Sequence, residues 1–135
     1  MGGFNQNEKQ FQMKIRIKGN SIRIRLTRSE VDRFGKDGYL EERTEFGNNM
    51  FVYTLAASAA ASQLSASYTD GNMSVIVPTA MAQEWTTTDV VGFENNMPIT
   101  TGKSLFILIE KDFKCIDNVS EDQSDNYEHP TLKCG

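Results

Sequence analysis

The sequence is poor in the residues on which most enzyme chemistry depends. It has one histidine, His129, and two cysteines, Cys115 and Cys134. General acid–base and nucleophilic catalysis normally use histidine, or a tuned carboxylate beside a nucleophile. A Gly-x-Ser-x-Gly elbow, a Gly-x-x-x-x-Gly-Lys phosphate loop and a Gly-x-Gly-x-x-Gly turn are all missing. We therefore expect no catalysis and no cofactor.

Long apolar runs are also missing. The longest, Leu105–Ile109, has five residues, whereas a membrane-spanning helix needs about 20. The first twelve residues are polar and lack a secretory apolar core. We expect a cytoplasmic protein without membrane contact. The domain organisation we predict is a polar extension over 1–12, one domain over 13–113 and an acidic tail over 114–135.

Alternating residues predict a β-hairpin near the start of the chain. Ile15 and Ile17 alternate with basic residues before a Gly19-Asn20 turn, and the alternation resumes after it. A capping box from Thr27 to Glu30 then predicts a helix that carries Val31 and Phe34 inward. This helix is expected to end at Gly35 or Gly38.

The rest of the domain predicts mostly strands. They are expected over 39–46, 50–56, 64–69, 73–77, 90–94 and 104–111, with a second short helix from Pro78 to Trp85. Asn48-Asn49 and Asn95-Asn96 are predicted hairpin turns, because asparagine tolerates positive φ. Trp85 is predicted to anchor the core. The fold class is α+β, with about eight mostly antiparallel strands and two short helices.

An internal repeat is a further hypothesis. A shift of 51 residues places Ile22, Ile24 and Leu26 on Met73, Val75 and Val77. Phe-x-Asn-Asn-Met also occurs twice, at 46–50 and 93–97, although with a shift of 47. Two β-β-α-β units predict a pseudo-duplicated small barrel, since closure removes exposed sheet edges. The alternative is chance recurrence of strand and turn patterns.

Several segments resemble a family of small uncharacterised bacterial proteins. They include Lys14–Thr27, Glu84–Asp89, Gly92–Met97, Lys103–Phe106, Lys111–Cys115 and Glu121–Tyr127. The resemblance extends over most of the chain from Met13 to Tyr127 and implies that Met13 is near the usual start. No activity is known to us for that family, so the resemblance implies no functional residue.

A second resemblance concerns one unit only. Ser74–Trp85, followed by Asp89 and a strand, is similar to the strand-Pro-helix-strand unit of AbrB-type swapped-hairpin barrels, which pair into DNA-binding dimers. The chain departs from that family because it lacks the Gly-Arg pair before the proline strand. Leu26 also stands where the first proline would fall. The resemblance therefore bears on architecture.

Charge is distributed unevenly despite a formal net charge of −4. Residues 14–36 hold eight basic side chains against Glu30 and Asp32, whereas Glu110–Glu128 holds seven acids and two lysines. A Gly19-Asn20 turn sets Arg16 opposite Arg23, and like charges opposed in this way are destabilising. The candidate binding residues are Lys14, Arg16, Lys18, Arg23 and Arg25.

Three interpretations of this basic hairpin remain open. The hairpin could be neutralised internally, by a strand carrying Glu41 and Glu45 or by the acidic tail. It could instead bind nucleic acid, because a basic stripe is typical of such binding. An acidic protein partner is the third option. The function predicted from these alternatives is binding or scaffolding through the basic face, and the oligomeric state is left open.

The tail offers a competing, weaker site. Cys115, His129 and Cys134 could supply three ligands to zinc, but their spacing matches no Cys-x2-Cys or His-x3-His knuckle. In a reducing cytosol the two cysteines are expected to stay reduced, with a disulfide as the alternative. Nucleic-acid binding is the runner-up to the predicted binding function, and a structural metal or thiol site in the tail is the competing class.

Overall fold

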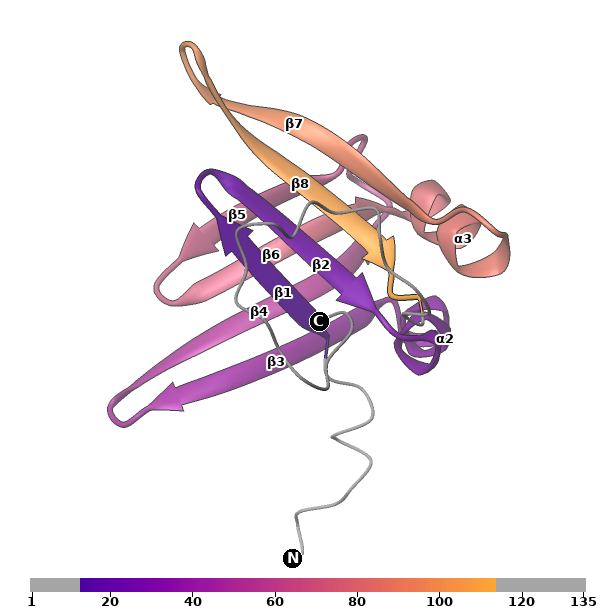
Figure 1. Ribbon diagram of the computed structural model, residues 1–135, viewed down its shortest axis with the longest axis horizontal. Coiled ribbons are helices and arrows are strands. Elements are labelled where there is room, and N and C mark those ends of the chain that lie inside the picture. Colours follow the sequence, from indigo (N-terminus) through magenta and orange to yellow (C-terminus); the bar gives the residue numbers. More distant parts are fainter. Residues whose placement is uncertain (1–12, 114–135) are drawn as a thin grey trace, which may run out of the picture.

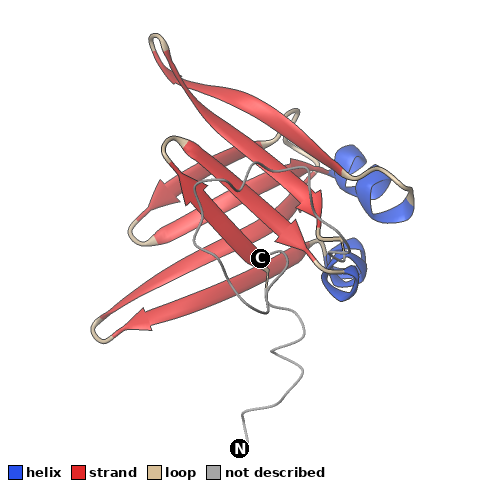
Figure 2. Ribbon diagram, viewed as in Figure 1, coloured by secondary structure: helices blue, strands red, loops and turns tan. Residues whose placement is uncertain are grey.

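A computed structural model describes residues 13–113. Within them, eight strands form two four-stranded sheets, and two helices lie together at one end of both sheets (Figure 1). The hairpin turns extend from the opposite end (Figure 2). The α+β class is confirmed. The predicted extension over 1–12 and the tail from 114 lie outside the described residues.

The two sheets are mixed. Sheet A has the order β1 (Lys14–Lys18), β2 (Ser21–Leu26), β8 (Lys103–Lys111) and β7 (Gly92–Thr100), and sheet B has the order β3 (Tyr39–Phe46), β4 (Asn49–Ser58), β6 (Asn72–Pro78) and β5 (Ser65–Thr69). Four strand pairs are antiparallel, while β2–β8 and β4–β6 are parallel.

The predicted closed barrel is wrong for the described residues. Each sheet joins an N-terminal hairpin to a C-terminal one through a parallel pair, and therefore ends on two edge strands instead of closing. The two halves do share one element order, strand-strand-helix-strand-strand. Whether that order reflects a duplication stays a prediction.

The predicted turn at Asn95-Asn96 is also wrong. Both residues lie inside β7, paired with Ile107 and Phe106 of β8. The chain instead turns after Thr100, where Gly102 supplies the positive φ of 75° that the reversal needs. The two Phe-x-Asn-Asn-Met segments are therefore not equivalent, because the first spans the β3–β4 turn.

Helix α2 (Arg28–Asp37) begins and ends as its sequence predicts. Thr27 Oγ1 accepts a hydrogen bond from the Glu30 N–H at 3.3 Å, and the Glu30 carboxylate accepts one from the Thr27 N–H at 2.8 Å. Both halves of the capping box are thus present. Gly38 ends the helix with φ 71°, and Val31 and Phe34 face the core.

Helix α3 (Thr79–Thr87) is held by its tryptophan. Trp85 is completely buried, packs edge-on against Phe34 with ring centroids 6.0 Å apart, and donates its indole N–H to the Val91 carbonyl at 2.9 Å. The prediction that Trp85 anchors the core is confirmed. Its ring joins α3 to α2 and its N–H joins α3 to the start of β7.

One hydrophobic core fills the space between the sheets and under the helices. Alternation along each strand turns one face inward, and the inward residues with no exposed surface are Ile24, Leu26, Ile107 and Ile109 of sheet A and Leu55, Val75 and Val77 of sheet B. The same alternation turns the basic side chains of β1 and β2 to the outer face of sheet A.

Candidate functional site

The outer face of the β1–β2 hairpin carries the five predicted binding residues. Lys14 pairs with Arg25, Arg16 with Arg23, and Lys18 with Ser21 across the antiparallel ladder. This register is the one that the Gly19-Asn20 turn predicts, so that prediction is confirmed. Two arginines therefore lie directly opposite one another on a sheet surface.

Two acidic residues neutralise part of this face. The second neighbour of β2 is β8, whose Glu110 pairs with Arg25 in the parallel register. One carboxylate oxygen of Glu110 lies 2.9 Å from Arg25 Nε and 3.4 Å from Arg23 Nε. Just after β8, Asp112 lies 2.8 Å from the Lys14 ammonium. Arg23 and Arg25 thus share the single carboxylate of Glu110.

The alternative in which a strand carrying Glu41 and Glu45 pairs with the hairpin and neutralises it is wrong. Both residues lie on β3, which belongs to sheet B. The strand that pairs with β2 on its other side is β8, in parallel orientation. Glu41 accepts hydrogen bonds from Tyr39 Oη and Arg43 Nε, each at 2.6 Å. These donors stabilise the carboxylate and lower the pKa of Glu41.

Arg16 and Lys18 remain exposed and have no ion pair within residues 13–113. Five basic side chains against Glu110 and Asp112 leave an excess of three positive charges on the face (5 − 2). Of the opposed pair Arg16 and Arg23, only Arg23 has a carboxylate partner among the described residues, so the repulsion between them is only partly offset.

The outer face of sheet A changes character away from β1. In register with Ser21 and Arg23, β8 presents the half-buried side chains of Phe106 and Leu108. Beyond them, β7 presents the exposed side chains of Asn96 and Glu94. A basic margin is thus followed by an apolar strip and then by a polar margin.

Glu30 is a second unusual group and lies outside that face. It is 1% exposed, and within the described residues its Oε2 has no hydrogen-bond partner. Burial raises the pKa of the Glu30 carboxyl, and the nearby charge of Glu42 raises it further, against the hydrogen bonds of the capping box. The sequence predicts the cap but gives no sign of this burial.

Glu30→Gln is expected to change the pH dependence of stability. Because the folded pKa lies above the unfolded one, the free energy of unfolding falls as pH rises from the unfolded pKa through the folded pKa. Glutamine keeps the capping acceptor and removes this loss, so the stability of the variant relative to the parent should rise as pH increases from acidic to neutral. Urea titrations across the acidic range measure both profiles.

Glu84→Gln, on the exposed face of α3, is the matched control. It should leave the profile parallel to that of the parent. A parallel profile for Glu30→Gln as well would contradict the burial argument.

The tail site cannot be compared with the structure, because Cys115, His129 and Cys134 lie outside the described residues. Within 13–113, no three His, Cys, Asp or Glu side chains gather in a way that could hold a metal ion. No helix in this part of the chain is long and apolar enough to cross a membrane.

Comparison with known proteins gives a family but not a function. A model of a family of unknown function (DUF7009) matches residues 13–131, which cover the whole described region. The chain belongs to this family. No curated protein and no solved structure matches the chain. Membership in DUF7009 is consistent with the predicted uncharacterised family and assigns no role to the basic face.

Proposed function

We propose that the chain is a binding domain without catalysis of its own, which recognises an acidic, extended segment of a partner protein through the outer face of β1 and β2. The observation that carries this proposal is the opposed Arg16–Arg23 pair, with Arg16 and Lys18 exposed and without an ion pair in the described region. An anionic partner would relieve the repulsion that this pair creates.

The position of β1 supports an extended partner. In sheet A, β1 pairs with β2 alone among the described strands, so one of its edges is open. A peptide that adds to such an edge gains main-chain hydrogen bonds, and its side chains alternate between the two faces. Acidic side chains would then lie beside Arg16 and Lys18, and apolar ones beside Ile17, which is 58% exposed.

The neighbouring strip favours a protein partner over nucleic acid. Phe106 and Leu108 continue the face beyond the arginines, and aromatic residues together with arginine are typical of protein interfaces. Nucleic acid also favours long basic stripes or aromatic stacking surfaces. DNA binding remains the alternative, and a DNA duplex is included in the binding experiment described next.

A labelled peptide tests the proposal. Fluorescence anisotropy would follow a peptide of about twelve residues that alternates glutamate with valine. Arg16→Glu should weaken binding about tenfold, and binding should weaken as salt rises. Glu110→Gln should strengthen it, because Arg23 and Arg25 lose their shared internal partner. Lys36→Glu, on the exposed last turn of α2, is the matched control and should change little.

Two outcomes would contradict the proposal. Equal weakening by Arg16→Glu and Lys36→Glu would mean that only overall charge matters. Tighter binding of a labelled DNA duplex than of the peptide, with the same loss in Arg16→Glu, would assign the face to nucleic acid instead.

A further inference from the structure

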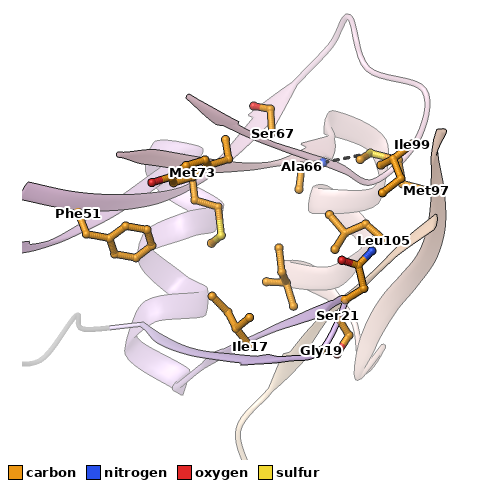
Figure 3. A pocket seen from close by; sticks show the side chains of 13 residues that line it. Ile17, Gly19, Ser21, Phe51, Ala66, Ser67, Met73, Met97, Ile99 and Leu105 are labelled. Atoms are coloured by element: carbon orange, nitrogen blue, oxygen red, sulfur yellow. Dashed lines mark hydrogen bonds between the residues drawn. The ribbon is translucent and has the colours of Figure 1, made fainter. Parts of the chain in front are cut away.

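The two sheets separate at the end opposite the helices and leave a cavity of about 470 Å³ between them. Thirteen of the described residues line it, and none of these thirteen is charged. Figure 3 shows Ile17 and Leu105 from sheet A facing Phe51 and Met73 from sheet B across this space. A largely apolar cavity of this size is typical of small-molecule sites.

Exposure increases from the floor of this cavity to its mouth. Ile22 and Met73 at the floor are 7% and 4% exposed, whereas Ile17 and Tyr68 on the edge strands are 58% and 65% exposed. Ile99, on β7 close to its turn, is 47% exposed. Several large apolar side chains thus remain in contact with water around one opening, and an apolar occupant would remove them from it.

We propose that this cavity binds an amphiphile with a single alkyl or acyl chain and an anionic head group. The proposal does not depend on the proposed function of the hairpin, because it uses the inner faces of the sheets. Met73 and Met97 contribute flexible thioethers to the lining, which adapt to a chain without fixed shape. The lining offers few polar groups that could orient a polar ligand.

The charge at the lip of sheet A favours an anionic head. The Asn20 side chain donates to the Ser104 carbonyl at 2.7 Å, which holds the β1–β2 turn against the start of β8. Lys103 precedes Ser104 and shares the inner face of Leu105 by alternation. The Lys103 side chain is exposed.

Sheet B contributes one opposing charge. Asp70 lies in the β5–β6 turn, two residues after Tyr68. The head group is therefore expected at the sheet A lip, beside Lys103, with the chain directed inward past Leu105.

A series of straight-chain carboxylates of about eight to fourteen carbons, kept below micelle formation, tests this by calorimetry. Each added methylene should tighten binding about fourfold until the cavity is full, after which affinity should level off. Trimethylammonium ions of equal chain length should bind at least about tenfold more weakly. Absence of binding, or affinity independent of chain length, would overturn the proposal.

Variants locate the binding. Ala66→Phe fills the cavity and should weaken binding at least about tenfold. Ile17→Asp changes a largely exposed side chain, so it should fold normally while placing an anion at the mouth and weakening binding similarly. Lys103→Glu should weaken carboxylate binding but not that of the matching alcohol. Unchanged affinity in Ile17→Asp, or equal loss in Lys36→Glu and Lys103→Glu, would refute the site.

Discussion

Trp85→Ala is expected to lower the free energy of unfolding by about 4 kcal/mol. The side chain is fully buried, so its removal leaves a cavity between the two helices and the start of β7. Its edge contact with Phe34 contributes about 1 kcal/mol of the loss. Urea denaturation followed by far-ultraviolet circular dichroism measures the change.

Two variants separate the causes of this loss. Trp85→Phe keeps an aromatic ring but loses the hydrogen bond to the Val91 carbonyl, which still accepts from the Lys111 N–H at 2.9 Å. Its cost should therefore be about half that of alanine. Phe46→Ala removes an aromatic side chain that is 67% exposed and should cost less than about 1 kcal/mol. Equal costs for Phe46→Ala and Trp85→Ala would contradict the account of the core.

Gly92→Ala should destabilise the protein by about 3 kcal/mol. Gly92 pairs with Glu110 where β7 begins, and a Cβ there would lie 2.9 Å from the Glu110 Cα and closer still to the Ile109 carbonyl oxygen. Backbone atoms cannot move aside as a flexible side chain can, so β7 and β8 must separate locally. Thermal unfolding of the variant measures the loss.

Gly102→Asn, in the turn of the same hairpin, is the matched control. A Cβ there meets nothing within 4 Å, and asparagine tolerates the positive φ of 75°. Its cost should stay below about 1 kcal/mol. If Gly92→Ala lowered the free energy of unfolding no more than this control, the claim that β7 closely approaches β8 at Gly92 would be contradicted.

Local features of the fold could be predicted because local rules govern them. The alternation of β1 and β2, the Gly19-Asn20 turn and the capping box at Thr27 each involve residues a few positions apart, and each is confirmed. The register of the basic face followed from the turn length alone.

Long-range pairing could not be predicted in this way. β2 pairs with β8, roughly 85 residues later in the sequence, and this parallel contact determines that Glu110 rather than Glu41 neutralises the arginines. Nothing near β2 in sequence indicates which strand is its second neighbour. The wrong prediction of a turn at Asn95-Asn96 has a related cause. These residues suit a turn, but both pair with residues of β8, and the β7–β8 ladder continues beyond them to Thr100 and Lys103.

The burial of Glu30 and the cavity between the sheets depend on tertiary packing. A glutamate in a capping box is usually solvated, whereas the side chain of Glu30 is 1% exposed. The cavity is lined from several strands that are far apart in sequence. The relevant residues, such as Ile17 and Met97, resemble ordinary core positions in the sequence.

Chemical-shift mapping by NMR tests the central claim, that the basic outer face of sheet A binds an acidic partner. Addition of the alternating glutamate peptide to the labelled protein should move the amide signals of 14–18, 21–25 and 106–110. The signals of α2 and α3 should stay in place, and the effect should fade at high salt. Shifts centred on the helices, or no shifts at low salt, would contradict the claim.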